Sequence, residues 1–81
     1  MNSAEIRIIR ARECWECGRL RALNPLDEPM LDALWCRAWE IRDELRRSGA
    51  SISDAWRQAW SRAQAEAGVG VEVVGRFYCG C

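Results

Sequence analysis

The sequence contains no histidine and no lysine, so all 12 basic side chains among its 81 residues are arginines. Without histidine, no side chain has an ordinary pKa near neutrality, and without lysine there is no amine to serve as a nucleophile or to form a Schiff base. An enzyme built from this chain would have to rely on carboxylates, on Tyr78 or on a thiolate. We therefore expect a protein that is not an enzyme and that has no small-molecule substrate.

Net charge and long apolar stretches are also missing. The 12 acidic residues balance the 12 arginines, which removes the simplest argument for binding nucleic acid. No apolar run approaches the roughly 18 residues of a membrane-spanning helix. The charged segment 1–12 lacks the apolar stretch of a secretory signal, so we expect a cytoplasmic protein without membrane contact. With 49% hydrophobic residues, the chain is expected to form one globular domain over residues 1–81.

Five cysteines are present in this short chain. Cys14 and Cys17 form a C-x-x-C motif followed by Gly18, and Cys79 and Cys81 form a C-x-C motif. A core of this size supplies only about 3–5 kcal/mol, so small domains usually need an additional staple. Four thiolates in two pairs match the closed tetrahedral site of a structural zinc ion, and the glycines permit the turns that bring the sulfur atoms together. The sequence therefore predicts one zinc ion bound by Cys14, Cys17, Cys79 and Cys81.

Three other uses of these cysteines stay open at this point. A disulfide framework needs an oxidising compartment, and five is an odd number of cysteines. A thiol–disulfide redox protein could use both motifs, although redox C-x-x-C motifs usually open a helix and Gly18 does not indicate a helix start. An iron–sulfur cluster is also held by four thiolates. The fifth cysteine, Cys36, is predicted to be an exposed thiol that faces away from this site.

Two long strands and one short strand are predicted at the ends of the chain. Residues 5–13 and 69–79 are rich in β-branched residues, and residues 19–23 could form a short strand after the C-x-x-C turn, or knuckle. The adjacent pair Ile8-Ile9 breaks the alternation of the first strand and suggests either a bulge or a strand with apolar residues on both faces. The buried face of the last strand is predicted to comprise Val69, Val71, Val73 and Phe77.

The middle of the chain predicts a helical hairpin. Apolar residues recur every three or four positions from Leu31 to Leu45, and Asp27 is placed to cap this first helix. Ser51 and Asp54 resemble a capping box for a second helix that ends at Gly68. The apolar face of the second helix is predicted to comprise Ile52, Ala55, Trp56, Ala59, Trp60 and Ala63. Because few residues connect the two helices, they should be antiparallel.

The predicted fold is therefore α+β, in the order strand, knuckle, helix, helix, strand. Both long strands run toward a cysteine motif, so if they are neighbours they must be parallel, with the helical hairpin as the crossover. The hairpin would cover a small two- or three-stranded sheet. The zinc site would then join the N-terminal and C-terminal strands.

The residues around the knuckle form the predicted partner-binding surface. Trp15 lies between two metal ligands, where burial is difficult and where an aromatic ring could anchor an interface. The predicted binding residues are Trp15, Arg10, Arg12, Arg19 and Arg21. A second aromatic patch on the helices is suggested by Trp35, Trp39 and Trp60.

These features lead us to expect a non-enzymatic, zinc-containing module that binds another protein. Its size and composition are common among accessory proteins of phages and mobile elements, and an inhibitor of a host defence complex is one concrete form of this expectation. The first alternative is a nucleic-acid-binding zinc module that uses the N-terminal arginines and depends steeply on salt. The second alternative is the thiol–disulfide redox protein described above.

Overall fold

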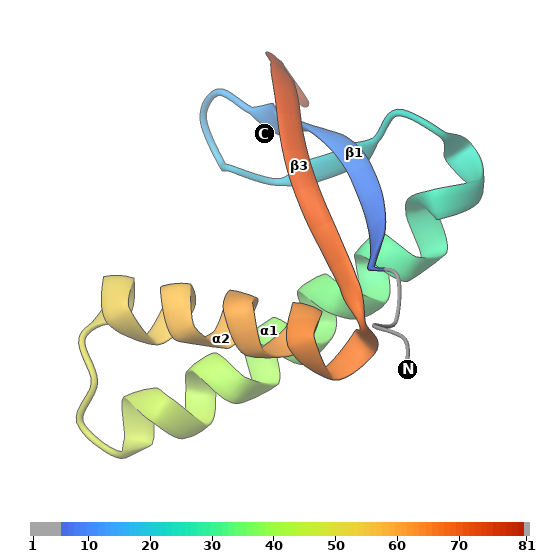
Figure 1. Cartoon of the computed structure of the whole chain (residues 1–81). Coiled ribbons are helices and arrows are strands. Elements are labelled where there is room, and N and C mark those ends of the chain that lie inside the picture. Colours follow the sequence, from blue (N-terminus) through green and yellow to red (C-terminus); the bar gives the residue numbers. More distant parts are fainter. Residues whose placement is uncertain (1–5, 81) are drawn as a thin grey trace, which may run out of the picture.

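The computed structural model describes residues 6–80 and shows a three-stranded sheet with a helical hairpin packed on one side of it (Figure 1). The elements are β1 (Arg7–Cys14), β2 (Leu20–Ala22), the 3-10 turn η1 (Pro25–Asp27), α1 (Glu28–Arg47), α2 (Ile52–Ala67) and β3 (Val69–Phe77). The α+β class and the order of strands and helices agree with the sequence prediction. Within the described residues, no helix is long and apolar enough to cross a membrane.

The strand order is β2-β1-β3, and the sheet is mixed. β1 pairs antiparallel with β2 and parallel with β3. Parallel neighbours need a crossover connection, which the α1–α2 hairpin supplies as the sequence predicts. Because β1 and β3 run in the same direction, Cys14 pairs with Phe77, two residues before Cys79. The topology therefore brings the two cysteine motifs to the same end of the sheet.

The irregularity in the sheet lies in β3 and not in β1. Ala11 pairs with Val73 while Arg12 pairs with Gly75, so Val74 is an extra residue opposite this step of β1. Such a bulge interrupts the alternation of faces along the strand. Val73, which the sequence predicts on the buried face, is 49% exposed. The prediction for this position is therefore wrong.

From Ile8 to Arg12, β1 alternates between exposed and buried residues. Ile9 is fully buried, whereas the adjacent Ile8 is 53% exposed. Of the two predicted alternatives, the bulge is wrong, because Ile8 and Ile9 pair with Gly70 and Val71 without a shift in register. Ile8 lies against Gly70, which has no side chain to compete for the space. One face of β1 therefore supplies core residues and the other faces solvent.

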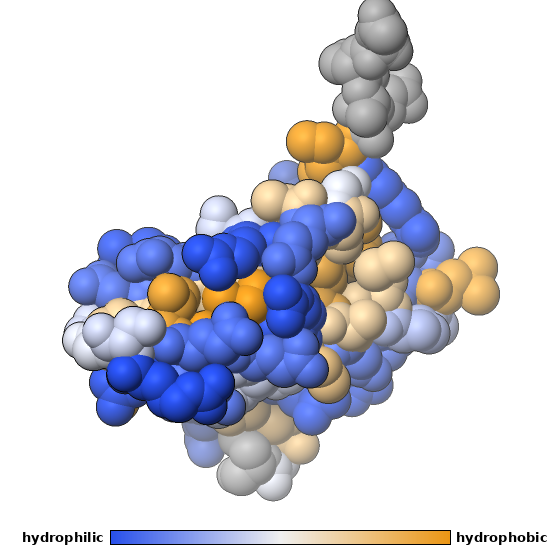
Figure 2. Space-filling model, turned by 90° about the horizontal axis from the view of Figure 1, so that it is seen from below, coloured by the Kyte–Doolittle hydropathy of each residue, from blue (hydrophilic) through white to orange (hydrophobic). Residues whose placement is uncertain are grey.

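The two helices meet through small side chains. Ala59 and Ala63 of α2 are buried against Leu34, Ala38 and Ile41 of α1. Alanine at this contact permits close helix packing, as the sequence predicts. Seen from below, hydrophilic side chains cover most of the hairpin, and apolar residues fill the furrow between the helices (Figure 2).

Both ends of α2 lie where the sequence predicts them, whereas Ile52 is not buried as the sequence predicts. Ser51 Oγ accepts a hydrogen bond from Asp54 N–H at 3.2 Å, as in the predicted capping box. The helix ends at Gly68, which has a φ of 67°. Ile52, predicted on the apolar face, is 59% exposed because it begins the helix at the far end of the hairpin from the core.

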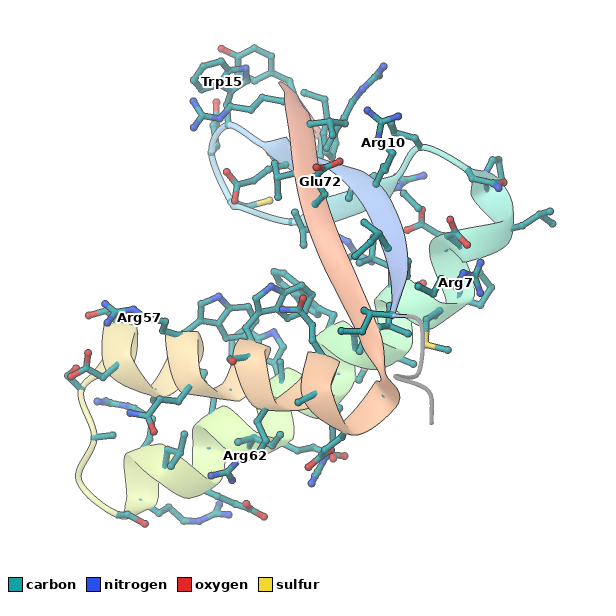
Figure 3. All side chains as sticks on the ribbon, viewed as in Figure 1. Arg7, Arg10, Trp15, Arg57, Arg62 and Glu72 are labelled. Carbon is teal, nitrogen blue, oxygen red and sulfur yellow. The ribbon has the colours of Figure 1, made fainter. Side chains whose placement is uncertain are left out.

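The start of α1 differs from the prediction. The Asp27 side chain caps no helix N–H, and its buried carboxylate forms an ion pair with Arg7 of β1 (Figure 3). Asn24 provides a cap one turn earlier, because its Oδ1 accepts a hydrogen bond from Leu26 N–H at 3.0 Å. The ion pair therefore holds η1 against the sheet. The Asp27 carboxylate pairs with Arg7, which is distant in the sequence, and does not cap the helix that follows it.

Candidate metal centre

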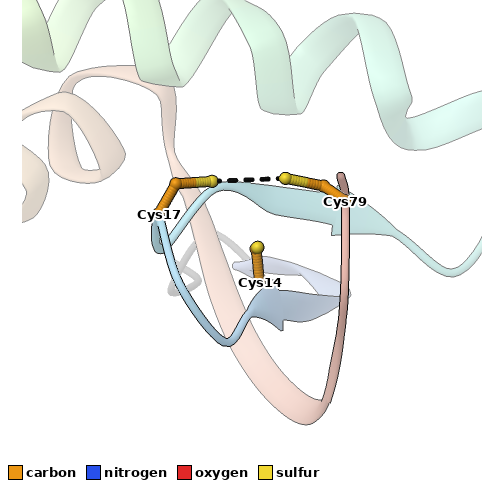
Figure 4. A group of neighbouring side chains, drawn as sticks. All are labelled: Cys14, Cys17 and Cys79. Atoms are coloured by element: carbon orange, nitrogen blue, oxygen red, sulfur yellow. Dashed lines mark hydrogen bonds between the residues drawn. The ribbon is translucent and has the colours of Figure 1, made fainter. Parts of the chain in front are cut away.

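Three of the four predicted ligands meet at the end of the sheet. The Sγ atoms of Cys14, Cys17 and Cys79 all lie within 4.8 Å of one another, and those of Cys17 and Cys79 are 3.4 Å apart (Figure 4). Around a zinc ion with bonds of about 2.3 Å, tetrahedral geometry places sulfur atoms about 3.8 Å apart. The three cysteines could therefore hold one metal ion. They join residues that are 62 positions apart in the sequence.

The fourth predicted ligand, Cys81, lies outside the described residues. Gly80, the residue before it, has a φ of 80°, in the left-handed region that glycine adopts without strain. This conformation turns the chain directly after Cys79. The fifth cysteine, Cys36, is exposed on α1, as the sequence predicts.

Backbone hydrogen bonds build the knuckle. Gly18 N–H donates to the carbonyl of Cys14 at 3.1 Å, and Gly18 itself has a φ of 77°. Cys14 N–H donates to the carbonyl of Arg19 at 2.8 Å, which closes the turn toward β2. Trp15 N–H donates to the carbonyl of Phe77 at 2.9 Å. This last bond connects the C-x-x-C turn to the end of β3 and so holds the two motifs beside each other.

The knuckle also stabilises the thiolate form of Cys14. The backbone N–H of Cys17 makes the largest contribution, and the backbone N–H of Glu16 and the thiol and backbone N–H of Cys79 add to it. Burial acts in the opposite direction, and the sum lowers the pKa of Cys14 from 9.0 to about 6. Since metals bind the thiolate and not the thiol, the lowered pKa favours the form of Cys14 that could bind a metal ion at neutral pH.

Trp15 projects from the knuckle and is 56% exposed. The Arg76 guanidinium lies 4.5 Å from the centroid of the Trp15 ring. The Tyr78 ring stacks on the Trp15 ring, with 6.4 Å between the ring centroids and an interplanar angle of 27°. Tyr78 is itself 73% exposed. Two exposed aromatic rings are thus held together beside the cysteine cluster.

The predicted binding arginines are exposed, but most of them have carboxylate partners, as Arg10 has in Glu72 (Figure 3). The ion pairs are Arg10–Glu72, Arg19–Asp32 and Arg21–Glu28, at 3.4, 3.6 and 3.6 Å. Arg12 forms no ion pair within residues 6–80. Because these carboxylates balance the arginines locally, the N-terminal strands do not form a strip of unopposed positive charge.

The aromatic patch that the sequence suggests at Trp35, Trp39 and Trp60 is present, and it also includes Trp56, which the sequence did not indicate as part of it. Trp35 and Trp39 of α1 and Trp56 and Trp60 of α2 form a continuous cluster, with ring centroids 5.0–6.2 Å apart. Trp39 is 42% exposed and the other three are half-buried. The signal was the spacing of four residues within each pair, which places both rings on one side of their helix. We call these four residues the tryptophan cluster.

A groove lies between the tryptophan cluster and the cysteine cluster formed by Cys14, Cys17 and Cys79. Its cavity has a volume of about 310 Å³. The lining includes Glu13 and Cys17 on the knuckle side, and Trp39, Trp56, Arg42 and Ile52 on the hairpin side. We call this cavity the tryptophan groove.

Comparisons of the chain with protein-family models, with curated proteins and with solved structures found no match.

Proposed function

We propose that the chain is a non-enzymatic binding module, in which Cys14, Cys17, Cys79 and Cys81 hold one zinc ion and the surface beside it binds another protein. The observation that carries this proposal is the convergence of three cysteine sulfur atoms, from both ends of the chain, within 4.8 Å. Thiolate ligands and a closed site of four favour zinc in a structural role. Cys81 is the natural fourth ligand because it follows Cys79 by two residues.

The small core supports a stapling role for the metal. The largest side chains that are fully buried are Ile9, Leu31 and Ile41, and much of the remaining core is alanine. Metal binding in zinc-finger peptides contributes about 10–16 kcal/mol, well above the roughly 3–5 kcal/mol that a core of this size supplies. A zinc ion at the end of the sheet would therefore stabilise the whole domain.

The exposed surface supports a protein partner more than a nucleic acid. Trp15 and Tyr78 present aromatic area that is already ordered, so binding loses little side-chain entropy. The arginines that a nucleic acid would use are mostly engaged by carboxylates. A phosphate backbone would have to displace those partners before it gained the same contacts.

Two measurements test the proposal. Elemental analysis of protein prepared without added metal should find one zinc per chain; iron, or less than half an equivalent of any metal, would overturn the assignment. A pull-down from the native host should capture a protein, and nuclease treatment should leave the capture unchanged. The role as an inhibitor encoded by a phage or mobile element, and the cytoplasmic location, stay predictions that the identity of the captured protein would test.

A thiol–disulfide redox protein is the second candidate, and two observations favour it. The Sγ atoms of Cys17 and Cys79 are 3.4 Å apart, and the pKa of Cys14 is lowered to about 6. Both features serve either function, because the thiolate is both the metal ligand and the nucleophile. However, the C-x-x-C motif lies in the turn between β1 and β2 and not at the start of a helix. A redox protein should cycle between dithiol and disulfide without metal, whereas the zinc module should keep its metal under reducing conditions.

A further inference from the structure

The tryptophan groove offers several aromatic surfaces to a ligand. Trp56 lies at the centre of the tryptophan cluster, with its ring centroid 5.0 Å from that of Trp35 and 5.7 Å from that of Trp39. The interplanar angles of these two pairs are 67° and 61°, so neighbouring rings are strongly tilted to one another. Rings arranged in this way can present both faces and edges to the same cavity.

A guanidinium group already occupies one part of this surface. The Arg42 guanidinium lies 4.4 Å from the centroid of the Trp39 ring, a distance typical of a cation–π contact. Its Nη1 atom is 2.9 Å from Asp43 Oδ1, so a carboxylate balances its charge. The chain's own Arg42 therefore shows that a tryptophan of this groove accepts a guanidinium group.

The opposite side of the tryptophan groove carries negative charge. The side chain of Glu13 is 40% exposed, and its ion-pair contact with Arg76 is long, at 3.9 Å. Cys17, whose sulfur belongs to the cysteine cluster, lines the same side. Since Arg42 is balanced by Asp43, the carboxylate of Glu13 is the charge that the groove offers to a ligand.

We propose that the tryptophan groove binds an arginine side chain of the protein partner, with an apolar neighbour of that arginine covering Ile52. This inference rests on the proposed function as a protein-binding module and names the chemistry of the contact. A guanidinium between the rings and Glu13 gains cation–π attraction and charge attraction together. The cavity of about 310 Å³ is at the lower end of the size of ligand sites, which suits one long side chain. Ile52 is 59% exposed at its rim.

The test uses the full chain with its metal and two dipeptide probes, acetyl-leucyl-arginine amide and acetyl-leucyl-citrulline amide. Citrulline has nearly the shape of arginine but no charge, so the pair isolates the contribution of the cation. Binding is followed through the indole N–H signals of the tryptophans in NMR spectra. We expect the arginine probe to shift the signals of the tryptophan cluster saturably, with an affinity about five-fold higher than that of the citrulline probe.

Matched variants locate the site. Glu13→Gln should weaken the arginine probe about three-fold, because one charge contact is lost at a partly exposed position. Glu16→Gln removes an exposed acid of the turn that follows β1 and should leave the affinity unchanged. Trp39→Leu keeps apolar bulk on α1 but removes the aromatic face, and it should weaken the probe, whereas Trp15→Ala should not.

Several results would overturn the inference: equal affinity for the two probes, no saturable shift, or a loss with Trp15→Ala and none with Trp39→Leu. Self-association of the chain that Glu13→Gln abolishes would assign the groove to a second copy instead. A captured protein whose measured affinity falls with Trp15→Ala but is unchanged by both Glu13→Gln and Trp39→Leu would reject the groove while the proposed binding function stands. Failure of the proposed function gives another result: no protein partner is captured at all.

Discussion

The knuckle and the helical hairpin both use tryptophan, but they hold it in different ways. In the knuckle, backbone hydrogen bonds and the cysteine cluster fix the chain, and Trp15 extends outward against Arg76 and Tyr78. In the hairpin, four tryptophans pack on one another above a contact made by alanines. By the proposed function, the first region depends on a metal staple, whereas the second depends on packed apolar surface. Perturbations that act on only one of these devices should therefore separate the two regions.

The largest effect should come from removing a cysteine of the knuckle. We expect Cys14→Ser to abolish stoichiometric zinc and to destabilise the domain by about 4 kcal/mol or more, since metal binding exceeds what the core supplies. Thermal unfolding followed by circular dichroism, together with elemental analysis, measures both changes. Cys36→Ser is the matched control, because that thiol is exposed on α1 and should leave metal content and melting nearly unchanged. An unaltered melting curve for Cys14→Ser would show that the hairpin core suffices and that the cysteine cluster is no staple.

The next effect concerns binding and not stability. Trp15→Ala should weaken the captured partner by about 2 kcal/mol or more, while zinc content and melting stay the same, because the exposed ring adds little to the core. The comparison is the double variant Arg10→Ala with Arg12→Ala, which should weaken a protein partner less. Isothermal titration at two salt concentrations measures both. If the double variant dominates and the salt slope falls by about two, the partner is a nucleic acid.

Packing of the hairpin gives the third prediction. Ala59 is fully buried between the helices, so Ala59→Leu should overpack this contact and destabilise the domain by about 1–3 kcal/mol. The zinc content should not change, because Ala59 lies in the helical hairpin, whereas the cysteine cluster lies at the end of the sheet. Ala65→Leu, at an exposed position of the same helix, is the control. Chemical denaturation measures the free energies of unfolding. Equal stability of the two variants would mean that the helices do not meet through Ala59.

The same contrast explains what the sequence could and could not predict. The parallel direction of β1 and β3 followed from local patterns once the two strands are neighbours, because each of them runs toward a cysteine motif. The bulge at Val74 did not, since no local signal distinguishes it from its neighbours in a valine-rich strand. The ion pair of Asp27 with Arg7 was missed because its partner lies 20 residues away, whereas the capping rule considers neighbours only.

The candidate site divides in a similar way. The meeting of Cys14, Cys17 and Cys79 was predictable because the spacing of the motifs carries the chemistry. The tryptophan groove was not, because it needs the angle between the hairpin and the end of the sheet. That angle is set by which residues of the helices pack on β1, and periodicity along one helix does not contain it.

The smallest effect should come from the ion pair across the hairpin, where Arg37 donates from Nε to Glu66 at 2.8 Å and from Nη2 at 3.2 Å. Arg37 lowers the pKa of Glu66 below its ordinary value of 4.5, so the pair stabilises the fold above that pH and loses its effect as pH falls through the lowered pKa. Both side chains are more than 40% exposed, so solvent screens the pair and we expect Glu66→Gln to lower the melting temperature only slightly at neutral pH. The difference from the unmodified protein should vanish in acid, whereas any loss of metal from the knuckle affects both proteins alike. Melting temperatures of the two proteins across the acid range test this, and a difference that persists below the pKa of Glu66 would mean that the Arg37 contact stabilises the hairpin through packing and not through charge.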